Sequence, residues 1–226
     1  VIDAMERHSG EYLKLWLDEI VEKKIHTVNM LGCHDGIPLL DLKGLLNEKR
    51  ITDLIDAVVR RGGYVKNLHG QKNVYYQVNA TYYSALGEDD RKMVLARAIQ
   101  MFMPGKPQVW YLDLFAGQND YEAMRRAGKD GHKEINRTNL STKDVAERLK
   151  KQVVLDQLEL LRMRNSFRIF SHEANISAES VGSRLTVWWH SEDSTARLTA
   201  DFADTSFLII IQDGKSTDET FRFEQK

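Results

Sequence analysis

The hydrophobic pattern of the chain changes its period near residue 167, and this change limits the folds that it can adopt. Up to that point, two short apolar runs, residues 26–32 and 107–112, are typical of buried strands. Helical spacing or helix-capping residues mark the segments 10–24, 48–61, 88–103, 119–127, 141–150 and 151–165. Beyond it, β-branched and aromatic residues dominate. The pattern predicts an α/β part, residues 1–166, followed by a small antiparallel β domain, residues 167–226.

Charge and cysteine content exclude several classes of protein. The 32 Lys and Arg residues nearly balance the 33 Asp and Glu residues, so the net charge is −1. A chain this neutral is not a generally basic nucleic-acid binder, and it offers no polybasic membrane anchor. Cys33 is the one cysteine, which excludes an intramolecular disulfide and a multi-cysteine zinc site. We expect Cys33 to be a buried thiol, and we expect no membrane span and no signal peptide.

Two polar segments are candidates for chemistry. His34 and Asp35 directly follow the apolar run 26–32, and the C-terminal ends of barrel strands carry the active sites of α/β barrels. The alternative is that Asp35 only caps a turn. Arg137 follows a short helix and suits an anionic or hydroxylated ligand, unless it is an ordinary surface arginine.

Residues 64–87 show no regular period and predict a long loop. Its aromatic and amide side chains, among them Tyr76 and Gln77, suit a sugar, because rings stack on its C–H faces and amides pair with its hydroxyls. The same tyrosines could instead pack the loop against the barrel. Three basic residues in the loop could bind phosphate or simply face water: Lys66, His69 and Lys72.

Several motifs of the chain resemble those of sucrose phosphorylases of glycoside hydrolase family 13, in the same order and at close to the same spacing. They are CHDGI (33–37), YQVNATYYSALG (76–87), LARAIQ (95–100), PGKPQV (104–109), AGQND (116–120) and INR (135–137). The block 76–87 is specific to the phosphorylase branch, whereas the His-Asp pair would fit any α-amylase relative. The resemblance covers roughly the C-terminal half of a family member.

The resemblance implies the C-terminal part of a (β/α)8 TIM barrel, with its last two βα units in residues 25–165. It implies a retaining mechanism in which sucrose and inorganic phosphate give α-glucose 1-phosphate and fructose. Asp35 then matches the transition-state stabiliser, His34 a sugar-binding histidine, and Arg137 an arginine of the glucose subsite. Tyr76 and Gln77 match the mobile loop that shapes the acceptor site.

No segment matches the family's nucleophile or its acid/base, which belong to earlier barrel strands. The chain also begins at Val1 rather than Met. We therefore expect a piece of a longer enzyme whose missing N-terminal barrel half is its partner. An incomplete barrel exposes sheet edges, so we expect the isolated chain to be inactive and aggregation-prone.

One departure concerns the substrate. The family usually has an aspartate two residues before Tyr76, and here that position is Val74. An anionic acceptor such as fructose 6-phosphate, or glycerate, is therefore an alternative to fructose, and a sucrose 6′-phosphate or glucosylglycerate phosphorylase is the alternative function. A non-catalytic carbohydrate-binding module is the alternative from a different class. The resemblance implies no metal and no organic cofactor, and it favours a cytoplasmic protein.

Overall fold

A five-stranded antiparallel sheet forms one end of the molecule. The computed structural model describes residues 1–67, 75–171, 173–214 and 220–225. The strands run in the order β10-β9-β8-β7-β6, so each pairs with its neighbour in the chain. They are β6 (Asn175–Val181), β7 (Arg184–His190), β8 (Thr195–Asp201), β9 (Ser206–Gln212) and β10 (Phe221–Gln225). In β7, β8 and β9 every second residue is buried, as expected for a sheet with one face on a core.

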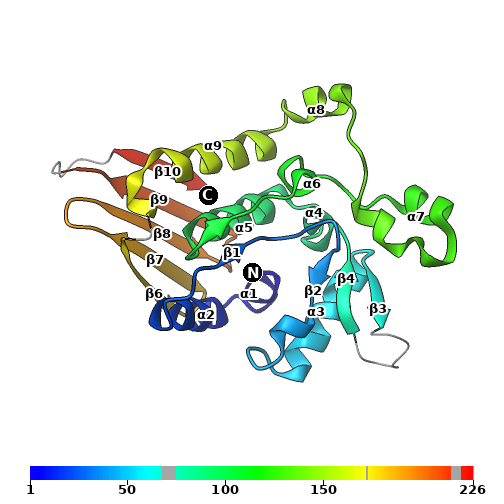
Figure 1. The fold of residues 1–226 in the computed structure, drawn as a ribbon, viewed down its shortest axis with the longest axis horizontal. Helices are drawn as coiled ribbons and strands as arrows, with labels where there is room; N and C mark the ends of the chain where they lie inside the picture. The colour runs from blue at the N-terminus through cyan, green and yellow to red at the C-terminus, as the bar shows by residue number, and fades with distance from the viewer. Residues whose placement is uncertain (68–74, 172, 215–219, 226) are drawn as a thin grey trace.

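Two helices, α2 (Glu11–Glu22) and α5 (Asp90–Phe102), pack against this sheet (Figure 1). A third helix, α9 (Gln152–Ser166), packs on α5. From Met93 onward, α5 is buried along its whole length, because α9 packs on one side of it and β8 and β9 on another. Trp189 of β7 ties the two layers together, since its indole nitrogen donates to the Phe102 carbonyl at 2.9 Å. The boundary at residue 166 stays a prediction.

In the described residues of the barrel part, one pair of strands is parallel. β1 (Val28–Asn29) pairs with β5 (Lys106–Pro107), and the chain between them includes α3 (Glu48–Arg60). Within the described residues, neither strand has a second neighbour. Consistent with an open edge, Val28 is 61% exposed and Met30 is 41% exposed. This geometry agrees with the expected C-terminal piece of a TIM barrel.

The prediction of buried strands over residues 26–32 and 107–112 was wrong in extent. Residues 26–32 contribute a strand of only two residues, and in residues 107–112 the strand ends at Pro107, after which α6 (Tyr111–Leu114) begins. A parallel strand extends through hydrogen bonds to neighbours on both sides. With one neighbour each, and with Pro107 lacking an N–H group, β1 and β5 remain short.

The prediction of an irregular loop over residues 64–87 was also wrong. β3 (Tyr64–Asn67) and β4 (Tyr75–Asn79) form an antiparallel hairpin, and α4 (Tyr82–Ala85) follows it. β2 (Ile37–Pro38) pairs with the other side of β4. The hairpin thereby lies against the chain that leaves β1 through His34 and Asp35.

The remaining elements are short. They are α1 (Ile2–Arg7), which the sequence pattern did not predict, η1 (Leu40–Leu42), α7 (Tyr121–Ala127), η2 (Gly128–Asn136), α8 (Thr142–Arg148) and η3 (Arg168–Phe170). None of the helices in the described part of the chain has the length and apolar character that crossing a bilayer requires.

Candidate active site

A tight turn after β1 presents the His-Asp pair. The Gly36 N–H donates to the Cys33 carbonyl at 3.1 Å, which closes the turn. The Cys33 thiol lies inside it, because its sulfur accepts from the Asp35 N–H at 3.3 Å. Cys33 is therefore half-buried and serves the turn, which corrects the prediction of a buried thiol.

Glycine is required at the end of this turn. Gly36 has a φ of +103°, and a Cβ there would lie 2.4 Å from the Val78 carbonyl oxygen of β4. Both the backbone conformation and the close approach of β4 exclude a side chain. The turn and the hairpin are thus packed backbone against backbone.

Two amide side chains of β4 hold the backbone of Asp35. Gln77 Nε2 and Asn79 Nδ2 donate to the Asp35 carbonyl oxygen at 2.7 Å and 2.8 Å. Gln77 also donates to Asn79 Oδ1 at 3.2 Å, and both residues are buried. Buried, mutually bonded amides have few alternative positions, so they fix the place of Asp35.

The carboxylate of Asp35 is surrounded by positive or protonatable groups. Its Oδ1 accepts from Lys133 Nζ at 2.5 Å and from Arg137 Nη2 at 3.3 Å, and its Oδ2 lies 3.3 Å from His34 Nε2. The hydrogen bond from Lys133 and the nearby positive charges lower the pKa of Asp35, against the opposing effect of partial burial. Asp35 is therefore ionised at neutral pH.

Residues at the end of η2 also hold the backbone of the turn. Arg137 Nε donates to the His34 carbonyl at 2.9 Å, and Asn136 Nδ2 donates to the Cys33 carbonyl at 2.8 Å. Glu134 Oε1 lies 3.6 Å from Arg137 Nη1, whereas Asp35 contacts Nη2 of the same guanidinium. The INR motif is thus a structural partner of the CHDG turn, although about 100 residues separate them in the chain.

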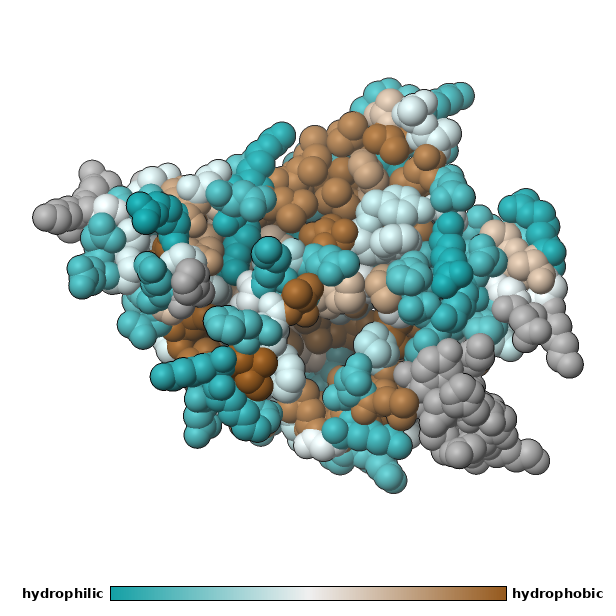
Figure 2. Space-filling model, in the orientation of Figure 1, coloured by the Kyte–Doolittle hydropathy of each residue, from teal (hydrophilic) through white to brown (hydrophobic). Residues whose placement is uncertain are grey.

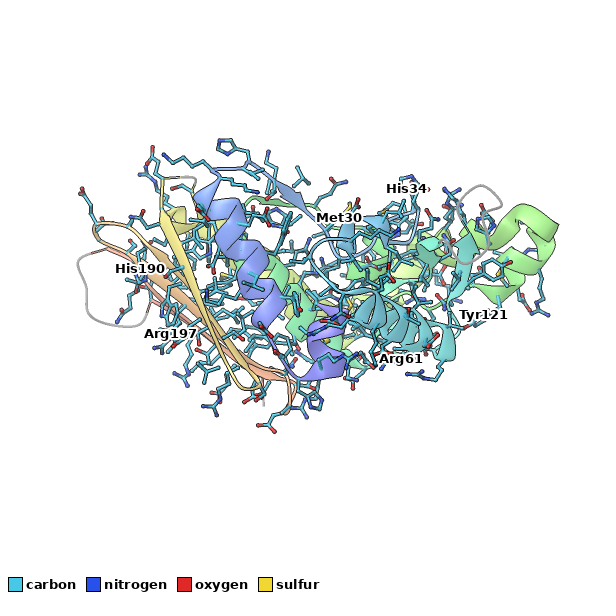
Figure 3. All side chains as sticks on the ribbon, turned by 90° about the horizontal axis from the view of Figure 1, so that it is seen from below. Met30, His34, Arg61, Tyr121, His190 and Arg197 are labelled. Atoms are coloured by element: carbon cyan, nitrogen blue, oxygen red, sulfur yellow. The ribbon has the colours of Figure 1, made fainter. Side chains whose placement is uncertain are left out.

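Aromatic rings flank the imidazole of His34. Its ring centroid lies 5.9 Å from that of Trp110, which in turn packs edge-on against Tyr111 at 4.6 Å. The Tyr111 hydroxyl donates to the Thr138 carbonyl next to the INR motif. Figure 3 shows Met30 and His34 along the same edge of the molecule, away from His190 and Arg197 on the sheet.

A cavity of about 550 Å³ adjoins the turn. Its walls include Asp35, Gly36, Gln77, Leu54 and Tyr82. Figure 2 shows the surface hollowed there, with apolar residues around the hollow. Ionised carboxylate, imidazole, guanidinium and amide groups beside a hollow suit the binding of a hydroxylated ligand.

The structure brings together four of the predicted site residues: His34, Asp35, Gln77 and Arg137. Tyr76 lies on β4 and Lys66 on β3. His69, Lys72 and Val74 lie outside the described residues. No group of three His, Cys, Asp or Glu side chains suited to a metal ion occurs in the part of the chain that the structure describes.

Sequence reasoning missed Lys133 and Trp110. Lys133 lies only four residues before Arg137, in a segment without apolar period, and its nearness to the INR motif was the available signal. Trp110 was assigned to a buried strand, although it directly precedes α6 at the same end of the barrel as His34.

Comparison with known proteins identifies the family of this chain. No protein-family model matches the chain. A sucrose 6(F)-phosphate phosphorylase of Ilumatobacter coccineus is 53% identical over 218 residues, which cover 92% of this chain and 42% of the relative. A sucrose phosphorylase of Streptococcus mutans is 37% identical, with 94% of this chain and 44% of the relative covered.

A comparison with solved structures supports the same family. The crystal structure of a sucrose 6F-phosphate phosphorylase from Thermoanaerobacter thermosaccharolyticum superposes with a TM-score of 0.88 at 34% identity, over 98% of this chain and 44% of that one. The chain thus spans about two fifths of the length of the curated relatives it matches. It belongs to the sucrose phosphorylase group of glycoside hydrolase family 13 and corresponds to the C-terminal part of these enzymes.

Proposed function

We propose that this chain is part of a retaining α-glucoside phosphorylase that converts sucrose 6F-phosphate and inorganic phosphate into α-glucose 1-phosphate and fructose 6-phosphate. The observation that carries the proposal is the ionised carboxylate of Asp35 beside the cavity: β4 fixes the backbone of this residue, and His34 and Arg137 flank the carboxylate. A fixed negative charge is what a sugar ring needs when positive charge develops at its anomeric carbon.

In the proposed reaction, a carboxylate of the preceding barrel part attacks the anomeric carbon and displaces the acceptor sugar. A second group there protonates the leaving oxygen and later takes a proton from phosphate as phosphate attacks the glucosyl-enzyme. Asp35 accepts hydrogen bonds from the 2- and 3-hydroxyls and stabilises the ring's positive charge in both steps. His34 binds the same sugar, and Arg137 belongs to the glucose subsite.

Sequence similarity favours the phosphorylated donor over sucrose. Two sucrose 6(F)-phosphate phosphorylases are 53% and 39% identical to this chain, and the S. mutans sucrose phosphorylase is 37% identical. The presence of Val74 in place of an aspartate points the same way. The proposed contacts of the acceptor phosphate are the basic residues of the sequence segment 64–87, Lys66, His69 and Lys72, because cations bind phosphate through charge-assisted hydrogen bonds. Sucrose itself, our main expectation from the sequence, is the second candidate.

The proposal requires the preceding barrel units. Open strand edges at β1 and β5 and exposed apolar residues such as Val28 and Met30 support a missing covering layer. Among the described residues, some polar side-chain atoms of the barrel part are also buried without a partner, Asn29 Oδ1 and Trp110 Nε1 among them. We expect the isolated chain to lack turnover. A cytoplasmic location is part of this proposal, because phosphorolysis conserves bond energy where sugar phosphates are used.

The test uses the protein that carries this chain together with the barrel units found in its relatives. Release of glucose 1-phosphate is measured from sucrose 6F-phosphate and from sucrose, each with inorganic phosphate. We expect faster release from the phosphorylated donor, and loss of at least about a hundredfold in kcat on Asp35→Asn, because a transition-state contact of this kind is worth about 3 kcal/mol. Asp56→Asn, at an exposed position on α3, is the matched control. Binding of sugar without any turnover would instead indicate a carbohydrate-binding module.

A further inference from the structure

We infer that Lys133 is a positioning residue for Asp35: it holds the carboxylate while the sugar pocket is empty, and it releases the carboxylate when the glucosyl hydroxyls arrive. The inference rests on the proposed function and adds to it a residue that lies outside the CHDGI and INR motifs.

The geometry singles out Lys133 among the donors to Asp35. Its Nζ lies 2.5 Å from Oδ1, whereas Arg137 Nη2 reaches the same oxygen at 3.3 Å. The Lys133 side chain is 30% exposed and the carboxylate 46% exposed, so water reaches both partners. The contact joins η2 to the turn after β1, across 98 positions of the chain.

The other charged groups around Asp35 are already engaged. Arg137 donates through Nε to the His34 carbonyl and lies against Glu134, which fixes its guanidinium in place. His34 faces the second carboxylate oxygen, and β4 contributes only the neutral Gln77 and Asn79 to the backbone of Asp35. Among the described residues, the Lys133 ammonium donates its hydrogen bond to Asp35.

Sugar hydroxyls compete with the protein donors for this carboxylate, most directly at Oδ1, which already faces both Lys133 and Arg137. Both oxygens of Asp35 face protein cations or a protonatable ring, yet the proposed role requires them to accept hydroxyl hydrogen bonds. Lys133 is the group best able to leave, because a solvent-accessible ion pair is weak and a lysine side chain is flexible. Its departure also removes a positive charge from the neighbourhood of a positively charged transition state.

The structure therefore predicts a specific kinetic signature for Lys133→Met. Without Lys133, Asp35 takes up a proton more readily, so the acidic limb of kcat/KM moves to higher pH. The sugar substrate no longer competes with an ion pair for Asp35, so its KM at neutral pH falls. Lys133→Arg keeps the positive charge, so its acidic limb lies at the wild-type pH. Lys150→Met removes an exposed lysine that pairs with Glu147 at 2.8 Å, and it leaves both quantities unchanged.

Two results would overturn the inference. An acidic limb that stays in place in Lys133→Met would show that the ion pair does not control Asp35. A rise in KM of fivefold or more would show that Lys133 binds the substrate and does not compete with it for Asp35.

A second measurement separates this inference from the proposed function. The carboxyl carbon of Asp35 is followed by 13C NMR during a pH titration, with Asp35→Asn used to assign its signal. We expect its midpoint to rise in Lys133→Met and not in Lys150→Met, whether or not the enzyme turns over sucrose 6F-phosphate. If the wild-type protein shows no phosphorolysis but Lys133→Met still raises the midpoint, the proposed function is disproved and the role of Lys133 stands. If the midpoint is unchanged in Lys133→Met, that role alone is disproved.

Discussion

Asn79 offers a sharp test of how the site is built, because Asn79→Asp changes its chemistry with almost no change of shape. The side chain is fully buried, its Nδ2 donates to the Asp35 carbonyl at 2.8 Å, and its Oδ1 accepts from Gln77. An ionised carboxylate in this place keeps the acceptor but loses the donor, and it faces a carbonyl oxygen. A protonated carboxyl group can still donate to that oxygen.

The expected cost follows from two contributions. Losing a buried hydrogen bond costs about 1–3 kcal/mol. Burial raises the pKa of a carboxyl group, and each unit of rise costs about 1.4 kcal/mol once the pH exceeds that pKa. A rise of about 2 units, well within the known range, therefore adds about 3 kcal/mol at neutral pH.

The sign of the pH dependence distinguishes this reasoning from a general packing defect. The introduced carboxyl group has a folded pKa above its unfolded value, so the penalty is absent at low pH. It grows as the pH rises and is complete above the folded pKa. Asn79→Asp should therefore lose more stability, relative to wild type, at pH 8 than at pH 5, and its kcat/KM should fall in parallel.

The assay is urea unfolding at these two pH values, together with glucose 1-phosphate release, in the protein that carries the preceding barrel units. Asn175→Asp, at an exposed position on β6, is the control. Equal behaviour of the two variants at both pH values would refute the argument that Asn79 holds the turn.

Three further predictions concern the fold around the site. Gly36→Ala should abolish glucose 1-phosphate release, because its φ of +103° and the approach of β4 leave no room; Gly182→Ala, with nothing near its Cβ, should retain activity. Trp189→Phe should lower the free energy of unfolding in urea by about 1–3 kcal/mol, since it leaves the buried Phe102 carbonyl without its donor. Burial raises the pKa of Asp113 from 3.8 to about 6, so the free energy of unfolding should decrease as the pH rises through that interval; Asp113→Asn should remove this slope.

Periodic and motif-bearing segments of the fold could be predicted from the sequence. The helices α3 and α9 each place apolar residues on one face, and the observed bounds lie within a residue or two of the predicted ones. His34, Asp35 and Arg137 were identified from a resemblance, and the structure brings them into contact. The CHDGI and INR motifs predicted these site residues because the two motifs contact each other directly in the fold.

Other parts could not be predicted, for physical reasons. The hairpin around β4 has no alternating pattern, because Gln77 and Asn79 are buried polar residues that bind the Asp35 backbone. The length of β1 depends on neighbouring strands rather than on its own residues. Lys133 is an ordinary lysine in a polar segment, and only the folded chain brings it to Asp35.

The most direct test of the account is the identity of the first product formed in phosphate buffer. Sucrose 6F-phosphate is incubated with the protein that carries the preceding barrel units, and the products are followed by 31P and 1H NMR. We predict that α-glucose 1-phosphate and fructose 6-phosphate appear together in equal amounts, with no signal of β-glucose 1-phosphate. Free glucose as the main product, or β-glucose 1-phosphate, would contradict it.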